Sequence, residues 1–376
     1  MSLKVGSLLG IPVKLHYTLI LAFLLIAWSL AVGFMPAEYP GLTSSQYWII
    51  GIIGAVGLFI SVLIHELTHS YVAQRNGIPV RSIMLFIFGG VSQTEVEAED
   101  PGVEFKMALV GPASSILIGA LIGAIWFFLN GFQFSPLILA PLRYWSYINL
   151  LLGGFNLLPA FPLDGGRVLR ASLWGWKYPL IDATEIATKV GTGFAYLFML
   201  GGFAIIFYGS LTSGLWLVFI GWFLKNGAES SLRQTRISEA LSGVKVKDIM
   251  TRDVRTVNPD LSLQDLMEEY FSKYKHGGYP VVKGSEVMGL VTLDDLRDVP
   301  SANHSETTVS EVMTPCEDLL CLNPNERVLD AFTKMSRGGV GRLPVREEEK
   351  LVGIVTRSDI LHSIKVRTEL SEPLPE

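Results

Sequence analysis

Two histidines and a glutamate lie together in a strongly apolar stretch of the sequence, LIHELTHSYVAQ. His65 and His69 are four residues apart, so on a helix their side chains share one face. Both imidazoles can then reach one Zn²⁺ ion, with Glu66 beside them to act on a water molecule. Zinc lowers the pKa of such a water to about 7, so a carboxylate can take its proton. Ionisable residues within an apolar helix are costly and usually functional, and the spacing predicts a hydrolytic zinc site.

A zinc site of this kind needs a third protein ligand and an open position. Asp164 is the main candidate, in the segment FNLLPAFPLDGGRVLR, where Pro159 and Pro162 would break a helix. A broken helix at membrane depth is tolerated where it lines a cavity or is buried in protein, so this carboxylate can turn inward. Taken alone, DGG fits an ordinary helix-ending turn equally well. His16 is the other candidate.

The composition indicates a membrane protein with a soluble extension. The chain has 376 residues, of which 49% are hydrophobic and only 17% are charged, whereas soluble domains carry about 25% charge. Almost all long apolar runs lie before about residue 228, which predicts a membrane domain over residues 1–228. The net charge of -5, without a basic tract, argues against a nucleic-acid partner.

Six apolar stretches are candidate membrane helices, which need roughly 20 residues each. They cover residues 15–34, 48–71, 105–129, 136–159, 181–208 and 212–226. Residues 80–94 are apolar and rich in strand-forming residues but too short to span, which predicts a membrane-associated β-hairpin. Lys and Arg gather before the first stretch and after the second, fourth and sixth. The positive-inside rule therefore predicts a multi-pass protein of the cell membrane with both termini in the cytoplasm.

An internal repeat follows a polar linker at residues 229–244. GYPVV around Pro280 recurs as RLPV around Pro344, and GLVTLDDL from Gly289 recurs as GIVTRSDI from Gly353. Each copy has an amphipathic stretch, two short apolar strands and a closing helix. The pattern predicts a duplicated α+β unit over residues 245–302 and 309–367. The fold class expected for the whole chain is a polytopic α-helical membrane protein followed by a soluble α+β module.

The motif HELTH with NLLPAFPLDGGR downstream resembles the site-2 protease family of intramembrane metalloproteases, over roughly residues 1–225. The resemblance implies His65, His69 and Asp164 as ligands of one Zn²⁺ and Glu66 as the general base. It also implies that Asn156 is a polar group near the scissile carbonyl, although an intramembrane Asn can equally bond neighbouring backbone. The implied substrate is a membrane-embedded or membrane-associated protein.

The segment FGGVSQT at residues 88–94 fits a role in holding substrate. A helical substrate must unwind before it can be cut, and its freed backbone groups then need partners. An edge strand at residues 84–92 can supply them by β-augmentation. Gly89 and Gly90 would permit a close approach of backbone. A hairpin that only fills space against the helices is the alternative.

The duplicated unit resembles a pair of cystathionine-β-synthase (CBS) domains, with the signature G-h-h-T-x-x-D in both copies. Arg342 and Arg357 favour phosphate at the second copy, whereas Asp294 disfavours it at the first. A pair that only dimerises the protein is the alternative, and we expect a homodimer through these domains in either case. The resemblance implies binding of ATP, ADP or AMP by the Thr and Asp of each signature: Thr292, Asp295, Thr356 and Asp359.

The sequence therefore predicts an intramembrane zinc metalloprotease that hydrolyses peptide bonds of membrane proteins under control of an adenine nucleotide. The alternative is a CBS-regulated metal-ion transporter in which HELTH forms the ion site. Glu66 separates the two hypotheses, because a transport site would use it as a ligand and a protease as a base. Cys316 and Cys321 are spaced too widely for a usual zinc half-site, and a reducing cytoplasmic compartment explains them.

Overall fold

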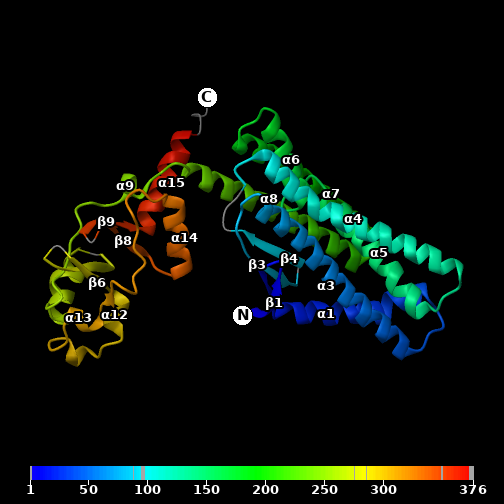
Figure 1. Ribbon diagram of the computed structural model, residues 1–376, viewed down its shortest axis with the longest axis horizontal. Helices are drawn as coiled ribbons and strands as arrows, with labels where there is room; N and C mark the ends of the chain where they lie inside the picture. The colour runs from blue at the N-terminus through cyan, green and yellow to red at the C-terminus, as the bar shows by residue number, and fades with distance from the viewer. Residues whose placement is uncertain are drawn as a thin grey trace. The chain divides into compact units, whose positions relative to one another are not determined.

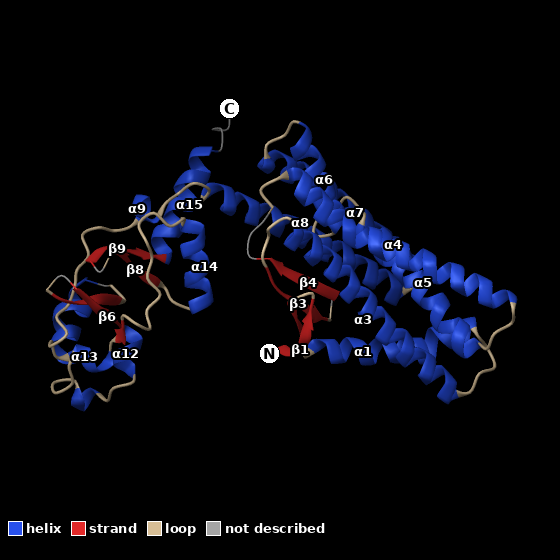
Figure 2. Ribbon diagram, in the orientation of Figure 1, coloured by secondary structure: helices blue, strands red, loops and turns tan. Residues whose placement is uncertain are grey.

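The structure is a computed structural model that describes residues 2–87, 89–94, 98–274, 276–284, 286–348 and 350–371. The chain divides into two compact units, Met1–Arg233 and Gln234–Glu376. Figure 1 follows the chain through both, and Figure 2 shows that the first unit is mainly helical with one small sheet, whereas the second mixes strands and helices.

The first unit contains a four-stranded sheet in the order β1-β2-β3-β4. Its strands are β1 (Ser2–Leu8), β2 (Ile11–His16), β3 (Val80–Phe86) and β4 (Gly89–Thr94). β3 and β4 form the predicted hairpin, β2 joins β3 in parallel, and β4 is an edge strand. The N-terminal hairpin was not predicted. Its turn is Leu9-Gly10, with both residues at positive φ, and it lacks the Asn-Gly or Asp-Gly signal of such turns.

Helices occupy all six predicted apolar stretches. The first comprises α1 (Thr18–Ser29), a π-helical turn η1 (Leu30–Phe34) and α2 (Met35–Glu38). The others are α3 (Ser44–Arg75), α4 (Pro101–Gly131), α5 (Pro136–Asn156), α7 (Leu180–Phe207) and α8 (Leu211–Ala240).

Four of these segments, among the described residues, are long and apolar enough to cross a membrane: Thr18–Glu38, α3, α4 and α7. α5 contains Arg143 and two asparagines, and α8 becomes polar in its second half, so six is an approximate number of spans. The predicted linker at residues 229–244 is helical as far as Ala240.

Large apolar side chains cover the outside of these helices. On α7, the side chains of Leu200 and Phe207 are 69% and 88% exposed. A soluble monomer rarely exposes large continuous apolar patches, whereas a bilayer solvates them. The same pattern holds on α1 and α4, at Ile20, Leu24, Leu117, Leu121 and Phe127.

The second unit combines helices with a five-stranded antiparallel sheet, whose strands lie in the order β5-β6-β9-β8 with β7 paired with β6. The strands are β5 (Gly278–Lys283), β6 (Glu286–Thr292), β7 (Thr314–Pro315), β8 (Arg342–Glu347) and β9 (Lys350–Thr356). The longer helices are α14 (Val328–Gly338) and α15 (Arg357–Ser371). Shorter ones are α9 (Val246–Ile249), α10 (Leu263–Asp265), η2 (Leu266–Phe271), α11 (Ser272–Tyr274), α12 (Leu293–Arg297), η3 (Ser301–Asn303) and α13 (Val309–Val312).

The two copies of the repeat exchange their first residues. Val246 lies in the core of the second copy, and its N–H donates to the Glu326 carbonyl at 2.9 Å. Val309 lies in the core of the first copy, and its N–H donates to the Leu261 carbonyl at 2.9 Å. Because each core needs residues from both copies, the repeat forms one module rather than two independent domains.

Candidate active site

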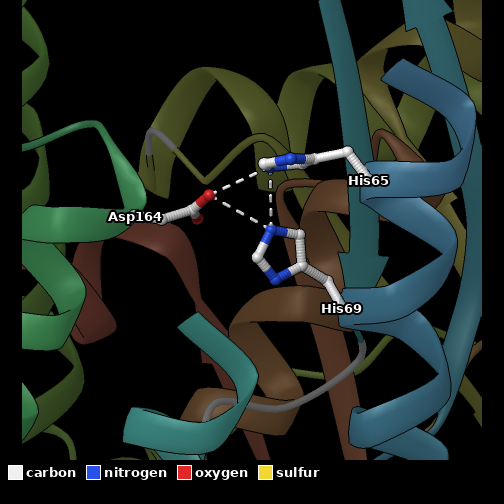
Figure 3. A group of neighbouring side chains, drawn as sticks. All are labelled: His65, His69 and Asp164. Carbon is white, nitrogen blue, oxygen red and sulfur yellow. Dashed lines mark hydrogen bonds and ion pairs between the residues drawn. The ribbon is translucent and has the colours of Figure 1, made fainter. Parts of the chain in front are cut away.

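The structure brings His65, His69 and Asp164 together. The histidines come from α3, and Asp164 is the first residue of α6 (Asp164–Trp176). The Nε2 atoms of the histidines lie 3.1 Å apart, and each is 3.1 Å from Oδ2 of Asp164. Figure 3 shows the three side chains pointing toward one another. Ligands of a tetrahedral zinc at about 2.0–2.1 Å lie roughly 3.3 Å from each other, so this donor set fits a zinc ion.

Both imidazoles are held from behind by α4. Nδ1 of His69 donates to the Met107 carbonyl at 2.6 Å, and Nδ1 of His65 lies 2.9 Å from Oγ of Ser115. The bond to a carbonyl fixes the proton of His69 on Nδ1 and leaves the Nε2 lone pair for a metal. Within the described residues, these two histidines and Asp164 form the one group of three ligands close enough to share an ion.

Gly111 allows α4 to lie this close to the histidines. A Cβ at this position would lie 2.1 Å from Nε2 of His69 and 2.8 Å from Nε2 of His65. From the sequence, this residue was expected to serve packing and not chemistry. Its only local signal is the pair Gly111-Pro112 in the middle of an apolar helix.

Asp164 is positioned by the break between α5 and α6. Added Cβ atoms at Gly165 and Gly166 would lie 2.2 Å and 2.5 Å from the Leu158 carbonyl and the Phe161 nitrogen, so α6 begins directly against this loop. The break leaves the carboxylate at the helix end that faces α3. The segment with Pro159, Pro162 and DGG therefore separates α5 from α6 and fixes where α6 begins.

A buried ion pair anchors α6 to α4. Nε of Arg170 donates to Oε1 of Glu104 at 2.9 Å, and its second nitrogen contacts the same oxygen. Glu104 and Arg170 are only 1% and 7% exposed. The guanidinium also lies over the Phe161 ring. Breaking such a pair costs about 3–5 kcal/mol because it leaves an unpaired charge buried. The ion pair therefore fixes α6, which carries Asp164, against α4, which hydrogen-bonds both histidines.

Glu66 lines the same cavity, whose volume is about 490 Å³. β4 lies against this carboxylate, because a Cβ at Gly90 would be 2.4 Å from Cγ of Glu66. The backbone of Ser92 also hydrogen-bonds Glu66. Gly89, with φ of +130°, lines the cavity beside them. The predicted edge strand over residues 84–92 is only partly right, because residues 84–86 belong to β3 inside the sheet and only residues 89–92 lie in the edge strand β4. That part of the predicted strand is in direct contact with the predicted base.

Asn156 also lines the cavity, but its amide has a local partner. Nδ2 donates to the Leu152 carbonyl, one turn earlier in α5, at 2.9 Å. This is the backbone bond that the sequence left open as an alternative to a role toward substrate. Arg167 lines the cavity too, although the sequence indicated it only as a loop charge after the fourth apolar stretch.

The predicted nucleotide residues of the second unit form two similar arrangements. Oδ2 of Asp295 accepts from the backbone N–H and the hydroxyl of Thr292, at 2.7 Å and 2.8 Å. Asp359 and Thr356 make the same two bonds, both at 2.8 Å. Each pair caps the N-terminus of the helix that follows, α12 or α15, as a capping box.

Arg342 lies between the two copies rather than at the second alone. It pairs with Thr356 across β8 and β9, while its guanidinium donates to the Gly278 carbonyl at 3.2 Å. Gly278 in turn lies opposite Thr292 across β5 and β6. Burial lowers the pKa of Arg342, which still leaves a charged guanidinium at neutral pH. Arg357 is exposed at the start of α15.

Two family models match this chain. The model described as peptidase family M50 matches residues 53–138 and 130–200, which contain all three candidate ligands. The model described as the CBS domain matches residues 246–302 and 309–366.

Relatives match over the whole length. Rip3 of Mycobacterium tuberculosis, which carries the name of a zinc metalloprotease, is 36% identical over 379 residues, covering 100% of this chain and 95% of its own. A zinc metalloprotease of Methanocaldococcus jannaschii is 32% identical over 380 residues, covering 100% and 99%. Among solved structures, the site-2 protease of M. jannaschii is 33% identical, covers 61% of this chain and 94% of its own, and has a TM-score of 0.42.

The full-length identity extends across the protease segment and the repeat, so the relatives share both parts. This favours the metalloprotease hypothesis over the ion-transporter alternative. The chain belongs to peptidase family M50, the site-2 protease family of membrane metalloproteases, and carries a C-terminal pair of CBS domains.

Proposed function

We propose that His65, His69 and Asp164 hold one Zn²⁺ in this protein and that Glu66 is the general base for peptide-bond hydrolysis. The observation that carries the proposal is the triangle of ligand atoms with 3.1 Å sides. The hydrogen bond from Nδ1 of His69 to Met107, which leaves Nε2 free to bind a metal, supports it. The cavity that Glu66 shares with the three ligands supports it too.

The residues divide the chemistry between them. When bound, zinc supplies a Lewis acid that polarises the scissile carbonyl and makes water more acidic. Glu66 takes a proton from the attacking water as the new C–O bond forms. It then delivers that proton to the amide nitrogen as the C–N bond breaks. The buried imidazoles cannot rotate freely, because α4 holds their far nitrogens.

We infer that the substrate is a membrane-embedded or membrane-associated protein that is cut in an extended conformation. A helix with its side chains is about 10–12 Å wide, so a cavity of about 490 Å³ has little room for more than one helical turn. Residues of β4 line this cavity. β4 is an edge strand that pairs with β3 on one side only. An unwound segment can therefore pair with it, and Gly89 and Gly90 let the two backbones approach each other.

The CBS pair is proposed as the regulatory part. We infer that ATP, ADP or AMP binds near the Thr and Asp pairs, with Arg342 as the phosphate-binding group that borders both copies. The pair is also proposed to join two chains in a homodimer. Both termini would lie in the cytoplasm of a multi-pass protein, as the loop charges indicate.

The test is cleavage by the purified full-length protein in detergent. A single-span substrate protein is incubated with wild type, with and without a zinc chelator, and with Glu66→Gln as a matched variant. We expect cleavage only by wild type without chelator. Chelator-resistant cleavage would contradict the metal mechanism, and ion flux without cleavage in reconstituted vesicles would favour a transporter.

A further inference from the structure

Arg167 brings a permanent positive charge to the active-site cavity. Among the described residues that line it, Arg167 is the one lysine or arginine. It lies three residues after Asp164 on α6, and residues three apart share a helix face. It lines the cavity, and its side chain is 34% exposed.

The carboxylate of Glu104 makes its hydrogen bonds with Arg170 and not with Arg167. Its Oε1 accepts from Arg170, by a bond of 2.9 Å from Nε and by a second contact. Nε of Arg167 lies 3.8 Å from the same oxygen, beyond hydrogen-bond distance. One carboxylate thus stands against two guanidinium groups, and Arg170, which is almost fully buried, makes the direct bonds. Arg167 keeps only the longer ion pair to Glu104.

Peptide hydrolysis is accelerated by such a charge, in addition to the polarisation that zinc would supply. As water adds to the scissile carbonyl, negative charge develops on the carbonyl oxygen, and donors aimed at it lower the barrier. Asn156 is the neutral donor expected there, but one N–H of its amide already bonds the Leu152 carbonyl at 2.9 Å. A guanidinium keeps its proton at any working pH and offers several N–H groups in one plane.

We propose that Arg167 is a catalytic residue that binds the scissile carbonyl oxygen and stabilises the negative charge that develops on it. The proposal rests on the metalloprotease function proposed above and adds one group to it. Arg170 and Glu104 act as positioning residues, because their buried pair fixes the helix from which Arg167 projects. The direction of the proton transfers through Glu66 is unchanged.

The kinetic test compares Arg167→Gln, Arg167→Lys and wild type on the single-span substrate. Arg75→Gln is the matched control, an exposed arginine at the end of α3 that stacks on Tyr71. Loss of a group that binds mainly in the transition state lowers kcat, by about 100-fold for one oxyanion donor. We expect that loss in Arg167→Gln with KM changed by less than about threefold. Arg167→Lys should fall between, and the control should match wild type.

A binding measurement makes the test independent of turnover. A peptide phosphinate, which is a tetrahedral anion, should bind Arg167→Gln more weakly by a factor similar to the loss in kcat/KM. Zinc content and thermal stability should equal those of wild type. A raised KM with normal kcat, unchanged phosphinate affinity or loss of zinc would each overturn the proposal. Failure of the protease function itself would appear separately, as the absence of chelator-sensitive cleavage by wild type.

Discussion

A Cβ on Gly111 would lie 2.1 Å from Nε2 of His69, the atom that faces Asp164. The ring cannot simply move aside, because its Nδ1 is bonded to the Met107 carbonyl at 2.6 Å. We therefore expect Gly111→Ala to displace the metal-binding nitrogen and to lower both bound zinc and cleavage by at least about tenfold, a typical effect of disturbing a metal site's surroundings. Elemental analysis of purified protein gives the zinc content.

Gly131 provides the control for this substitution. It lies in the same helix, α4, and an added Cβ there would meet nothing within 4 Å. Gly131→Ala should keep full zinc and full activity. If Gly111→Ala also kept its zinc, the close approach of α4 to the histidines would not be what shapes this site.

Glu66→Gln tests the general base. The substitution keeps the shape of the side chain and removes its ability to accept a proton. Since the three proposed ligands are untouched, we expect zinc to remain while cleavage falls by about 100-fold or more, the range for a lost acid–base group. Zinc analysis and cleavage are measured on the same preparation. Normal cleavage by this variant would rule out Glu66 as the base.

Asp164→Asn tests the third ligand. The amide keeps the size of the carboxylate but loses its charge, so it binds Zn²⁺ more weakly. We expect zinc affinity and cleavage to fall together, in contrast to Glu66→Gln. His16, the other candidate from the sequence, bonds Oγ1 of Thr18 at 2.9 Å and lies outside the ligand group. Wild-type activity in Asp164→Asn would show that the third ligand is another residue. His16→Ala would then be the next variant to measure.

These residues differ in how far sequence alone could predict them. His65 and His69 could be paired because the geometry of one helix fixes what lies four residues apart. Asp164 is 95 residues from His69, and only the resemblance to a known family connected the two motifs. Gly111 and Arg167 depend on how separate helices pack, and no local pattern encodes that distance.

The fold shows the same division. The apolar stretches predicted the helices because burial in lipid demands length and apolarity, which are local properties. The hairpin at β3 and β4 was visible as a run of strand-forming residues too short to span. The sequence did not predict that Val246 packs in the core of the second CBS copy and Val309 in that of the first. A repeat shows that two segments are similar, but not which hydrophobic core each of them joins.

Control by a nucleotide is expected from how α8 continues into the second unit. This helix runs from Leu211 to Ala240, and the next residues, Leu241 and Val244, belong to the core of the second CBS copy. A ligand that shifts this core between two states can influence the protease only by its differential affinity for them, typically about 1–3 kcal/mol. We therefore expect ATP or AMP to change the cleavage rate several-fold rather than completely.

Asp359→Ala and Asp295→Ala are matched variants for this prediction, because each loses the same two bonds from its threonine. Each should lose about 1 kcal/mol of stability from the cap, so their melting temperatures serve as an internal check. The exposed charge of Arg357 lies beside the second signature and that of Asp294 beside the first, so Asp359→Ala should abolish the nucleotide effect more fully. Cleavage rate is measured against nucleotide concentration, with binding followed by calorimetry. A flat rate and no heat of binding for wild type would leave the CBS pair as a dimerisation module.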